Sequence, residues 1–276
     1  MNIQNEPIQL DSSKAQAFGD KLLLALNYGA LCLMTSIGHR TGIFDVMRAA
    51  APATATEIAR KAGLNERYVV EWLGAMVTAG VIEVDPTSTR YVLPMEHAAF
   101  LTRAAAADNF GVFTQYIGLL GTVEDEIIAC FRNGGGVPYE KFRRFHAVMA
   151  EDSGQSVLSS LQAHILPLVP GLTERLARGI RVLDLGCGSG RIMCRMAQIY
   201  PASQFLGIDL SPQAILNAQK EACAKGLLNV DFSVRDLSNF DMTAEPESFD
   251  LVTTFDAIHD QAQPLNVLKG IQRTLK

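Results

Sequence analysis

The chain has 276 residues, of which 48% are hydrophobic, so it is longer than one typical domain and can bury two cores. Its 24 basic and 29 acidic residues give a formal net charge of −5, which argues against a surface that binds polyanions. The five cysteines are an odd number without a C-x-x-C pair, so we expect no disulfide framework, no metal site and a cytoplasmic protein.

The N-terminal region is polar at first and then apolar. Met1–Lys14 lacks the basic-then-apolar layout of a signal peptide. The most apolar run, Leu22–Met34, is about a dozen residues long and contains Asn27, which makes it too short and too polar for a membrane span. We therefore expect no membrane association and interpret this run as a buried or dimer-forming helix.

The next segment has the pattern of a winged helix. Thr54–Leu64 predicts a short capped helix, and Asn65 is placed to cap a second helix over Glu66–Ala79. Val81–Val84 and Arg90–Leu93 then predict a hairpin around a polar turn. We expect a winged helix domain over residues 1–97.

A winged helix first suggests DNA, but the second helix of this pair does not fit that partner. Its charged residues are Glu66, Arg67 and Glu71, so the helix is slightly acidic. The rest is apolar around most of its circumference: Tyr68, Val69, Val70, Trp72, Leu73, Met76 and Val77. Such a helix packs against other elements rather than facing phosphates, so nucleic acid is not expected as a partner.

Residues 98–172 predict several helices broken by the glycine run Asn133–Pro138. A flexible run beside Tyr139 and His146 suits a segment that closes over a ligand, although a plain helical connector is an equal alternative. Tyr116, on an earlier apolar helix, is a candidate for the same pocket, with core packing as its alternative. Tyr116, Tyr139 and His146 are therefore candidate substrate residues.

After an expected hinge at Pro167–Gly171, the segment Val182–Gly190 reads as a buried strand that runs into a glycine-rich turn. The glycines are Gly186, Gly188 and Gly190, and Asp184 lies two residues ahead of the first. The dinucleotide fingerprint is G-x-G-x-x-G, whereas the spacing here is G-x-G-x-G. This register does not suit a pyrophosphate.

Three further strands are each expected to bring an acid to one edge of a parallel sheet. They are Gln204–Ile208 ending at Asp209, Val230–Val234 closing near Asp236, and Phe249–Phe255 closing at Asp256. Ligands bind outside the carboxyl ends of such strands, so Asp184, Asp209 and Asp236 should form one acidic edge. That edge repels phosphate and favours a cation with hydroxyl groups, such as S-adenosylmethionine (SAM). Asp209 and Asp236 as ordinary helix caps are the alternative.

With these elements in order, Arg181–Lys276 resembles the class I, Rossmann-like, SAM-dependent methyltransferases. The resemblance implies an α/β fold in which Asp184 and the glycine turn hold the methionyl end of SAM. It also implies that Asp209 binds the ribose hydroxyls and that Asp236 and Leu237 bind the adenine. Neighbouring cofactor candidates are Cys187, Leu210 and Phe255, with simple packing as the alternative for Cys187.

His259 is the candidate catalytic residue. It follows the fourth strand, at the edge where the methyl group of SAM should emerge. Imidazole titrates near neutrality, so His259 can remove a proton from a hydroxyl acceptor while the oxygen attacks the methyl carbon. The pair His259-Asp260 resembles the base position of small-molecule O-methyltransferases; Asp260 either orients the ring or caps a helix near Pro264. A wall of the pocket is the alternative role for His259, and the other histidines have weaker claims: His39, His97, His146 and His164.

A complete class I sheet has seven strands, whereas four are predicted before the chain ends at Lys276. We therefore expect the C-terminal strands to be missing and the chain to be a truncated form of a longer protein. The expected division is a winged helix domain over 1–97, a helical linker and lid over 98–172, and a methyltransferase domain over 173–276.

The whole layout resembles a bacterial group of SAM-dependent methyltransferases with unassigned acceptors. This resemblance implies a homodimeric enzyme with a small-molecule acceptor, methylated on a hydroxyl or phenol oxygen. Two alternatives remain open. One is a SAM-sensing regulator that binds DNA through the winged helix, and the other is a catalytically silent ligand-binding scaffold.

Overall fold

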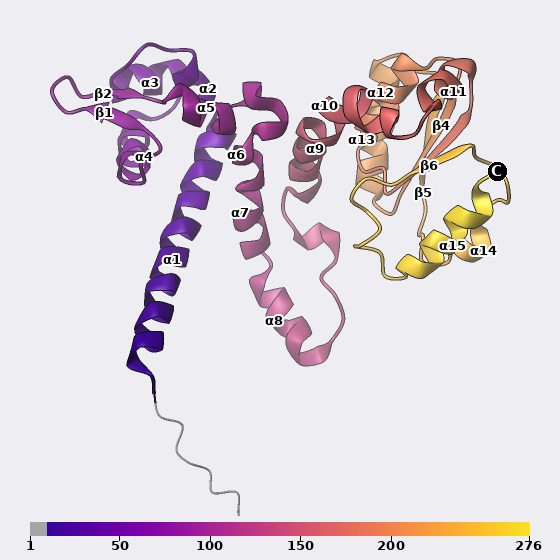
Figure 1. The fold of residues 1–276 in the computed structure, drawn as a ribbon, viewed down its shortest axis with the longest axis horizontal. Helices are drawn as coiled ribbons and strands as arrows, with labels where there is room; N and C mark the ends of the chain where they lie inside the picture. The colour runs from indigo at the N-terminus through magenta and orange to yellow at the C-terminus, as the bar shows by residue number, and fades with distance from the viewer. Residues whose placement is uncertain (1–9) are drawn as a thin grey trace, which may run out of the picture. The chain divides into compact units, whose positions relative to one another are not determined.

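The structure is a computed structural model that describes residues 10–276. The first nine residues, which carry most of the segment Met1–Lys14 tested above for a signal peptide, lie outside the described part. The chain divides into two compact units, with the division between Phe142 and Arg143 (Figure 1). The expected hinge at Pro167–Gly171 does not mark this division, because Leu166 and Leu172 are buried in the core of the second unit.

The first unit is mainly helical. Its longer elements are α1 (Ser12–Thr41), α2 (Ile43–Arg48), α3 (Ala55–Ala62), α4 (Glu66–Thr78), α5 (Met95–Leu101), α7 (Gln115–Gly121) and α8 (Glu124–Asn133). Shorter pieces are the strands β1 (Glu83–Asp85) and β2 (Arg90–Val92), the helix α6 (Phe110–Phe113) and the 3-10 helices η1 (Arg103–Asp108) and η2 (Tyr139–Lys141).

The winged helix follows its sequence signals closely. The Thr54 hydroxyl accepts a hydrogen bond from the backbone of Glu57, whose carboxylate accepts one in return from the backbone of Thr54, so α3 starts with a capping box. The Asn65 side chain caps α4, and β1 pairs with β2 as an antiparallel hairpin. The predicted winged helix is confirmed.

Helix α4 turns its apolar face into the core of this unit. The indole of Trp72 donates a hydrogen bond of 2.8 Å to the Met34 carbonyl, and its ring meets that of Phe44 edge to face at 5.3 Å. The last turns of α1 pass close by at Gly38, where a Cβ atom would lie only 2.5 Å from Phe44. Trp72 therefore ties α4 to α1.

Helix α1 is much longer than the dozen-residue run that the sequence suggested. It begins at the Asp11 cap and continues without a break to Gly42, because Asn27 and the internal glycines do not interrupt a helix. By length and composition alone it could cross a membrane, and only 22% of its most apolar window is buried within the described residues. The prediction that the apolar run Leu22–Met34 is too short to span a membrane is therefore wrong for the whole helix α1. Its large exposed apolar side chains are Phe18, Leu22, Leu23, Leu24, Leu26, Tyr28, Leu33 and Ile37.

The second unit holds a parallel four-stranded sheet with the order β5-β4-β3-β6. The strands are β3 (Arg181–Leu185), β4 (Gln204–Asp209), β5 (Val230–Val234) and β6 (Leu251–Thr253). The helices are α9 (Phe145–Gln155), α10 (Val157–Ser160), α11 (Leu172–Arg178), α12 (Arg191–Ile199), α13 (Pro212–Ala224), α14 (Phe240–Thr243) and α15 (Pro264–Thr274). A π-helical turn η3 (Leu161–Ile165) and a 3-10 turn η4 (Leu166–Leu168) join α10 to α11. The predicted α/β fold is confirmed.

Both faces of this sheet are covered, as the apolar strands predicted. Along β3, Val182 belongs to a core cluster shared with α12 and α13, whereas Leu183 and Leu185 belong to a second cluster shared with α14 and α15. This alternation is the two-residue period of a strand, and it places Asp184 on the same face as Val182. Since all four strands are parallel, their carboxyl ends meet at one edge.

Strand β6 is shorter than the predicted Phe249–Phe255. At its start, Phe249 bridges to Leu275 after α15 instead of pairing with β3. At its end, Thr253 is the last residue paired, opposite Asp184, because β3 turns away into the glycine loop.

Candidate functional site

The glycine turn after β3 has the backbone that its sequence requires, because Gly186, Gly188 and Gly190 all have positive φ angles. Their neighbours differ. A Cβ on Gly186 would lie 2.4 Å from the Ala257 side chain, and one on Gly190 would lie 2.5 Å from the ring of Phe232. A Cβ on Gly188 would have no neighbour within 4 Å. Two of the glycines thus make room for the protein itself, and only Gly188 leaves room for a ligand.

The backbone amides of this turn are engaged by protein acceptors. Those of Gly186 and Cys187 donate to the Ile208 carbonyl at 2.8 and 3.0 Å, and that of Gly188 donates to the Asp209 carboxylate at 2.8 Å. A dinucleotide loop directs such amides at phosphate oxygens. Here the amides of Gly186, Cys187 and Gly188 donate to protein oxygens instead. This agrees with the G-x-G-x-G spacing of the glycines, which does not suit a pyrophosphate.

Asp184 is a buried acid, with only 3% of its surface exposed. Burial, together with the nearby charge of Asp209, raises the pKa of the Asp184 carboxyl to about 7, and one hydrogen bond opposes this shift. That bond comes from the Thr253 hydroxyl on β6, at 2.8 Å. Sequence reasoning missed Thr253, whose place beside Asp184 depends on the register of two strands that are distant in sequence.

Asp209 ends β4 beside Asp184. One carboxylate oxygen accepts the amide of Gly188, and the other accepts the amide of Ser211 at 2.8 Å. The helix cap of α13 is Ser211, so the alternative in which Asp209 itself caps the helix is wrong. Each carboxylate oxygen can accept more than one hydrogen bond, so Asp209 keeps acceptor sites for ligand hydroxyls.

The remaining cofactor candidates lie in different settings. Asp236 is exposed after β5, and its carboxylate accepts the amide of Ser238 at 2.8 Å. The Leu237 side chain is buried in the core, whereas Leu210 is largely exposed. Phe255 is half-buried against the cluster shared with α12 and α13.

The thiol of Cys187 is neutral. Burial and the nearby carboxylates raise the pKa of its thiol far above the ordinary value, which leaves no thiolate at neutral pH. Its sulfur lies close to Gly207 on β4, where a Cβ would be only 2.8 Å away. Among residues 10–276 no group of three or more histidine, cysteine or acidic side chains is arranged to hold a metal ion.

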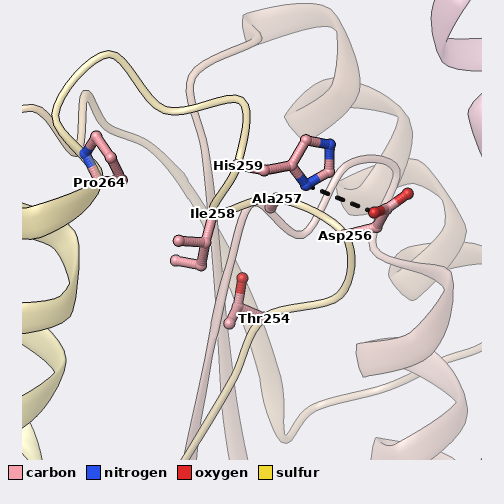
Figure 2. Close-up of a pocket in the computed structure, with 6 residues that line it drawn as sticks. All are labelled: Thr254, Asp256, Ala257, Ile258, His259 and Pro264. Atoms are coloured by element: carbon pink, nitrogen blue, oxygen red, sulfur yellow. Dashed lines mark ion pairs between the residues drawn. The ribbon is translucent and has the colours of Figure 1, made fainter.

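His259 lies in the loop between β6 and α15 and lines a cavity of about 360 Å³ (Figure 2). The six lining residues are Thr254, Asp256, Ala257, Ile258, His259 and Pro264. The Thr254 hydroxyl is buried and has no hydrogen-bond partner among the described residues, which sequence reasoning did not foresee. The cavity therefore offers a carboxylate and an imidazole beside apolar walls.

Two carboxylates flank the His259 ring. Asp256 lies 3.6 Å from Nδ1, and Asp260 lies 3.3 Å from Nε2. Helix α15 takes Gln263 as its N-cap, so the alternative in which Asp260 caps this helix is wrong. Asp256 has a left-handed backbone with φ of 56°, unusual outside glycine, which turns the chain sharply at the end of β6.

The loop of His259 rests on the glycine turn. Ala257 occupies the space that a side chain on Gly186 would need. The Gln261 side chain donates to the Ala257 carbonyl at 3.1 Å and closes the loop on itself. Gly186 thus helps to set the position of His259, which links the predicted cofactor turn to the predicted base.

The three candidate substrate residues lie in different elements. Tyr116 is half-buried in α7, and Tyr139 begins η2, both in the first unit. His146 lies in α9 of the second unit, where its Nε2 is 3.2 Å from the Ser211 hydroxyl. His146 therefore lies next to Ser211. Ser211 follows Asp209, the last residue of β4, by two residues.

Two protein families match this chain. Residues 29–103 match the Rv2258c-like winged HTH domain, and residues 176–276 match the methyltransferase domain. The second unit carries a methyltransferase domain. These two matches agree with the predicted methyltransferase domain and with the predicted winged helix before it.

Known proteins that resemble the methyltransferase domain include the ubiquinone biosynthesis O-methyltransferase of Leptothrix cholodnii, which is 31% identical over 99 residues. That match covers 36% of this chain and 40% of the relative. The chain therefore spans about 40% of the length of this curated relative.

Two solved structures resemble the chain over most of its length. The mitomycin 7-O-methyltransferase MmcR has a TM-score of 0.64 at 16% identity, and the match covers 96% of this chain and 79% of that one. PigF with SAH has a TM-score of 0.63 at 20% identity, with coverage of 94% and 78%. At these identities the likeness shows that the winged helix and the methyltransferase domain share a fold with these proteins.

Proposed function

We propose that this protein transfers the methyl group of SAM to an oxygen atom of a small-molecule acceptor, with His259 as the general base. The observation that carries the proposal is the engagement of the glycine-turn amides by Ile208 and Asp209, next to the buried acid Asp184. Such a site rejects phosphate and favours a cationic adenosyl compound.

The residues of the acidic edge fit the groups that SAM carries. Asp209 keeps free acceptor sites for the two ribose hydroxyls, and Gly188 leaves open space for close approach to the turn. Asp236 and the backbone of Leu237, at the end of the neighbouring strand β5, are assigned to the adenine. SAM supplies an activated methyl group, and the protein has to bind it, orient it and exclude water.

His259 lies in the right loop for proton removal. It lines the cavity, and the loop is fixed to the glycine turn through Ala257 and Gly186. A neutral imidazole there accepts the hydroxyl proton as the acceptor oxygen attacks the methyl carbon, and the flanking carboxylates of Asp256 and Asp260 stabilise the imidazolium that forms. Relatives named as O-methyltransferases support oxygen as the methylated atom.

The direct test is transfer of a labelled methyl group from SAM to a panel of phenols and aliphatic alcohols, with amines as a comparison set. Methylated phenol or alcohol products support the proposal. Salt-dependent binding of duplex DNA without methyl transfer would instead favour a regulator. Binding of SAM without transfer to any member of the panel would favour a silent scaffold.

The ribose assignment predicts the effect of Asp209→Ala. This change should weaken binding of S-adenosylhomocysteine (SAH) by about 1–3 kcal/mol, because it removes charged acceptors of hydroxyl hydrogen bonds. Isothermal titration calorimetry measures the loss. Asp231→Ala, at an exposed position inside β5, is the matched control and should leave the affinity unchanged. Equal affinities for the two variants would contradict the assignment.

A homodimer is the second part of the proposal. Large apolar side chains such as Leu22 and Leu26 are exposed along α1, and such a surface needs a partner. Leu26→Glu should therefore shift the full chain from dimer to monomer in analytical ultracentrifugation, whereas Gln16→Glu, which adds the same charge at a polar position of α1, should not. A wild-type monomer at micromolar concentration would contradict the dimer, and its capture by phospholipid vesicles would assign α1 to a membrane.

A further inference from the structure

Helix α9 is fastened to the helices that follow β3 and β4. Nε2 of His146 lies 3.2 Å from the hydroxyl oxygen of Ser211, the N-cap of α13. The guanidinium of Arg191, the first residue of α12, donates a hydrogen bond of 2.8 Å to the Ala150 carbonyl. A Cβ on Gly154 would lie 3.4 Å from the same guanidinium. His146, Ala150 and Gly154 are spaced by four residues, so one face of α9 makes these contacts.

Each fastening point directly follows a part of the expected SAM site. Arg191 is the next residue after Gly190, the last glycine of the turn. Ser211 comes two residues after Asp209, which is assigned to the ribose hydroxyls. The proposed base His259, by contrast, lies in the loop between β6 and α15. The contacts of α9 described above therefore lie on the cofactor side of the site.

A chain of hydrogen bonds leads from His146 to the ribose acceptor Asp209. The Ser211 hydroxyl accepts the amide of Ala214 at 3.2 Å, and the amide of Ser211 donates to one oxygen of Asp209 at 2.8 Å. The other oxygen of Asp209 accepts the amide of Gly188 at 2.8 Å. A serine hydroxyl has one donor and two acceptor sites, so it can bond to the imidazole and to the Ala214 amide together. His146 thus holds, from outside α13, the residue whose amide orients Asp209.

We propose that His146 is a positioning residue for the cofactor, which orients the Asp209 carboxylate towards the ribose hydroxyls through Ser211. This inference rests on the proposed function, because it concerns the assigned ribose site. It moves His146 from the acceptor side of the reaction, where the sequence placed it, to the cofactor side. His146 contacts no reacting atom in this role. It fixes the acceptor geometry before the ligand arrives, so less freedom is lost on binding.

His146→Ala should weaken the binding of SAH about fivefold, the effect of one hydrogen bond of ordinary strength. An SAH analogue without the two ribose hydroxyls lacks the groups assigned to Asp209. The same substitution should therefore change the affinity for this analogue by less than about twofold. His146→Gln should restore most of the affinity for SAH, because a glutamine amide extends about as far as Nε2 and can donate or accept a hydrogen bond.

Steady-state kinetics separates the cofactor side from the acceptor side. With an acceptor found in the panel, His146→Ala should raise KM for SAM and leave kcat at saturating SAM close to that of the wild type. KM for the acceptor should not change. A histidine that lined the acceptor pocket would instead raise KM for the acceptor.

The test is calorimetric titration of the full chain and its variants with SAH and with the analogue that lacks the ribose hydroxyls. His164→Ala, at an exposed histidine of η3 in the same unit, is the matched control and should leave both affinities unchanged. Ser211→Ala completes a double-mutant cycle. In that background His146→Ala should have no further effect on SAH binding, because its partner is already absent.

The outcomes separate this inference from the proposed function. Unchanged SAH affinity in His146→Ala, an equal loss for SAH and the analogue, or a rise in the acceptor KM alone would overturn the role of His146. In each of these cases the wild type still binds SAH, and the methyltransferase function stands. Failure of the wild type to bind SAH would overturn both.

A second variant keeps the test decisive should His146→Ala fail to fold. His146→Phe removes both ring nitrogens and keeps a ring beside Phe145, whose centroid lies 5.6 Å from that of His146. It should show the same selective loss for SAH over the analogue. Wild-type affinity for SAH in His146→Phe would overturn the inference.

Discussion

His259→Ala is expected to lower kcat for a hydroxyl acceptor on the order of 100-fold, because the acceptor loses the base that removes its proton. Some activity should remain, since much of the rate of methyl transfer comes from holding two reactants together and excluding water. The measurement is steady-state transfer of labelled methyl groups at saturating SAM. The affinity for SAH should stay within about threefold of wild type, because His259 is assigned to the acceptor and not to the adenosyl group.

The control for this variant is Asp260→Asn. It keeps the imidazole and removes one of the two flanking charges, the one 3.3 Å from Nε2. A milder loss is expected, on the order of tenfold, because the imidazolium that forms during proton transfer loses one of the two charges that stabilise it. Unchanged turnover in His259→Ala would remove the base and leave His259 as a wall of the cavity.

Gly186→Ala is expected to destabilise the second unit by about 3 kcal/mol. An alanine would have to adopt a φ of 74°, which costs about 1–2 kcal/mol outside glycine. Its Cβ would also lie 2.4 Å from the Ala257 side chain, and relieving such a contact costs about 1–3 kcal/mol. Since the strain is relieved by moving the loop that carries His259, methyl transfer should fall as well. Chemical denaturation without ligand measures the stability change.

Gly188→Ala separates the two contributions. Gly188 also has a positive φ, of 53°, but a Cβ there meets nothing within 4 Å. The loss of stability should therefore be only about 1–2 kcal/mol, from the backbone alone. If the two variants unfolded at the same denaturant concentration, the contact between Gly186 and Ala257 would not constrain the loop.

The local elements of this fold could be predicted from sequence because their signals are local. Thr54 and Glu57 form a capping box within one helical turn, and Asn65 caps α4 through its own side chain. The length of α1 could not be read from its most apolar stretch, because the helix is bounded by Asp11 and Gly42 and not by the ends of that stretch. Strand β6 was predicted too long, since its limits depend on pairing with β3 and with Leu275.

The acids and glycines of the site could be predicted from the sequence. The residues that surround them in the fold could not. The spacing of Gly186, Gly188 and Gly190 predicted a sharp turn, and all three do have positive φ angles. The space beside Gly186 is filled by Ala257 and not by a ligand. This depends on a contact between residues about 70 positions apart in the sequence. The raised pKa of Asp184 likewise follows from burial and from the charge of Asp209, which only the folded sheet brings together.

The central claim is that the acidic edge selects a cationic adenosyl donor over phosphorylated carriers. Calorimetric titration of the full chain with SAM, SAH, NADH and ATP, side by side in one buffer, tests this claim most directly. We predict that SAM and SAH bind with micromolar affinity and that NADH and ATP give no measurable heat. Binding of NADH or ATP, with no binding of either adenosyl-sulfur compound, would contradict the account.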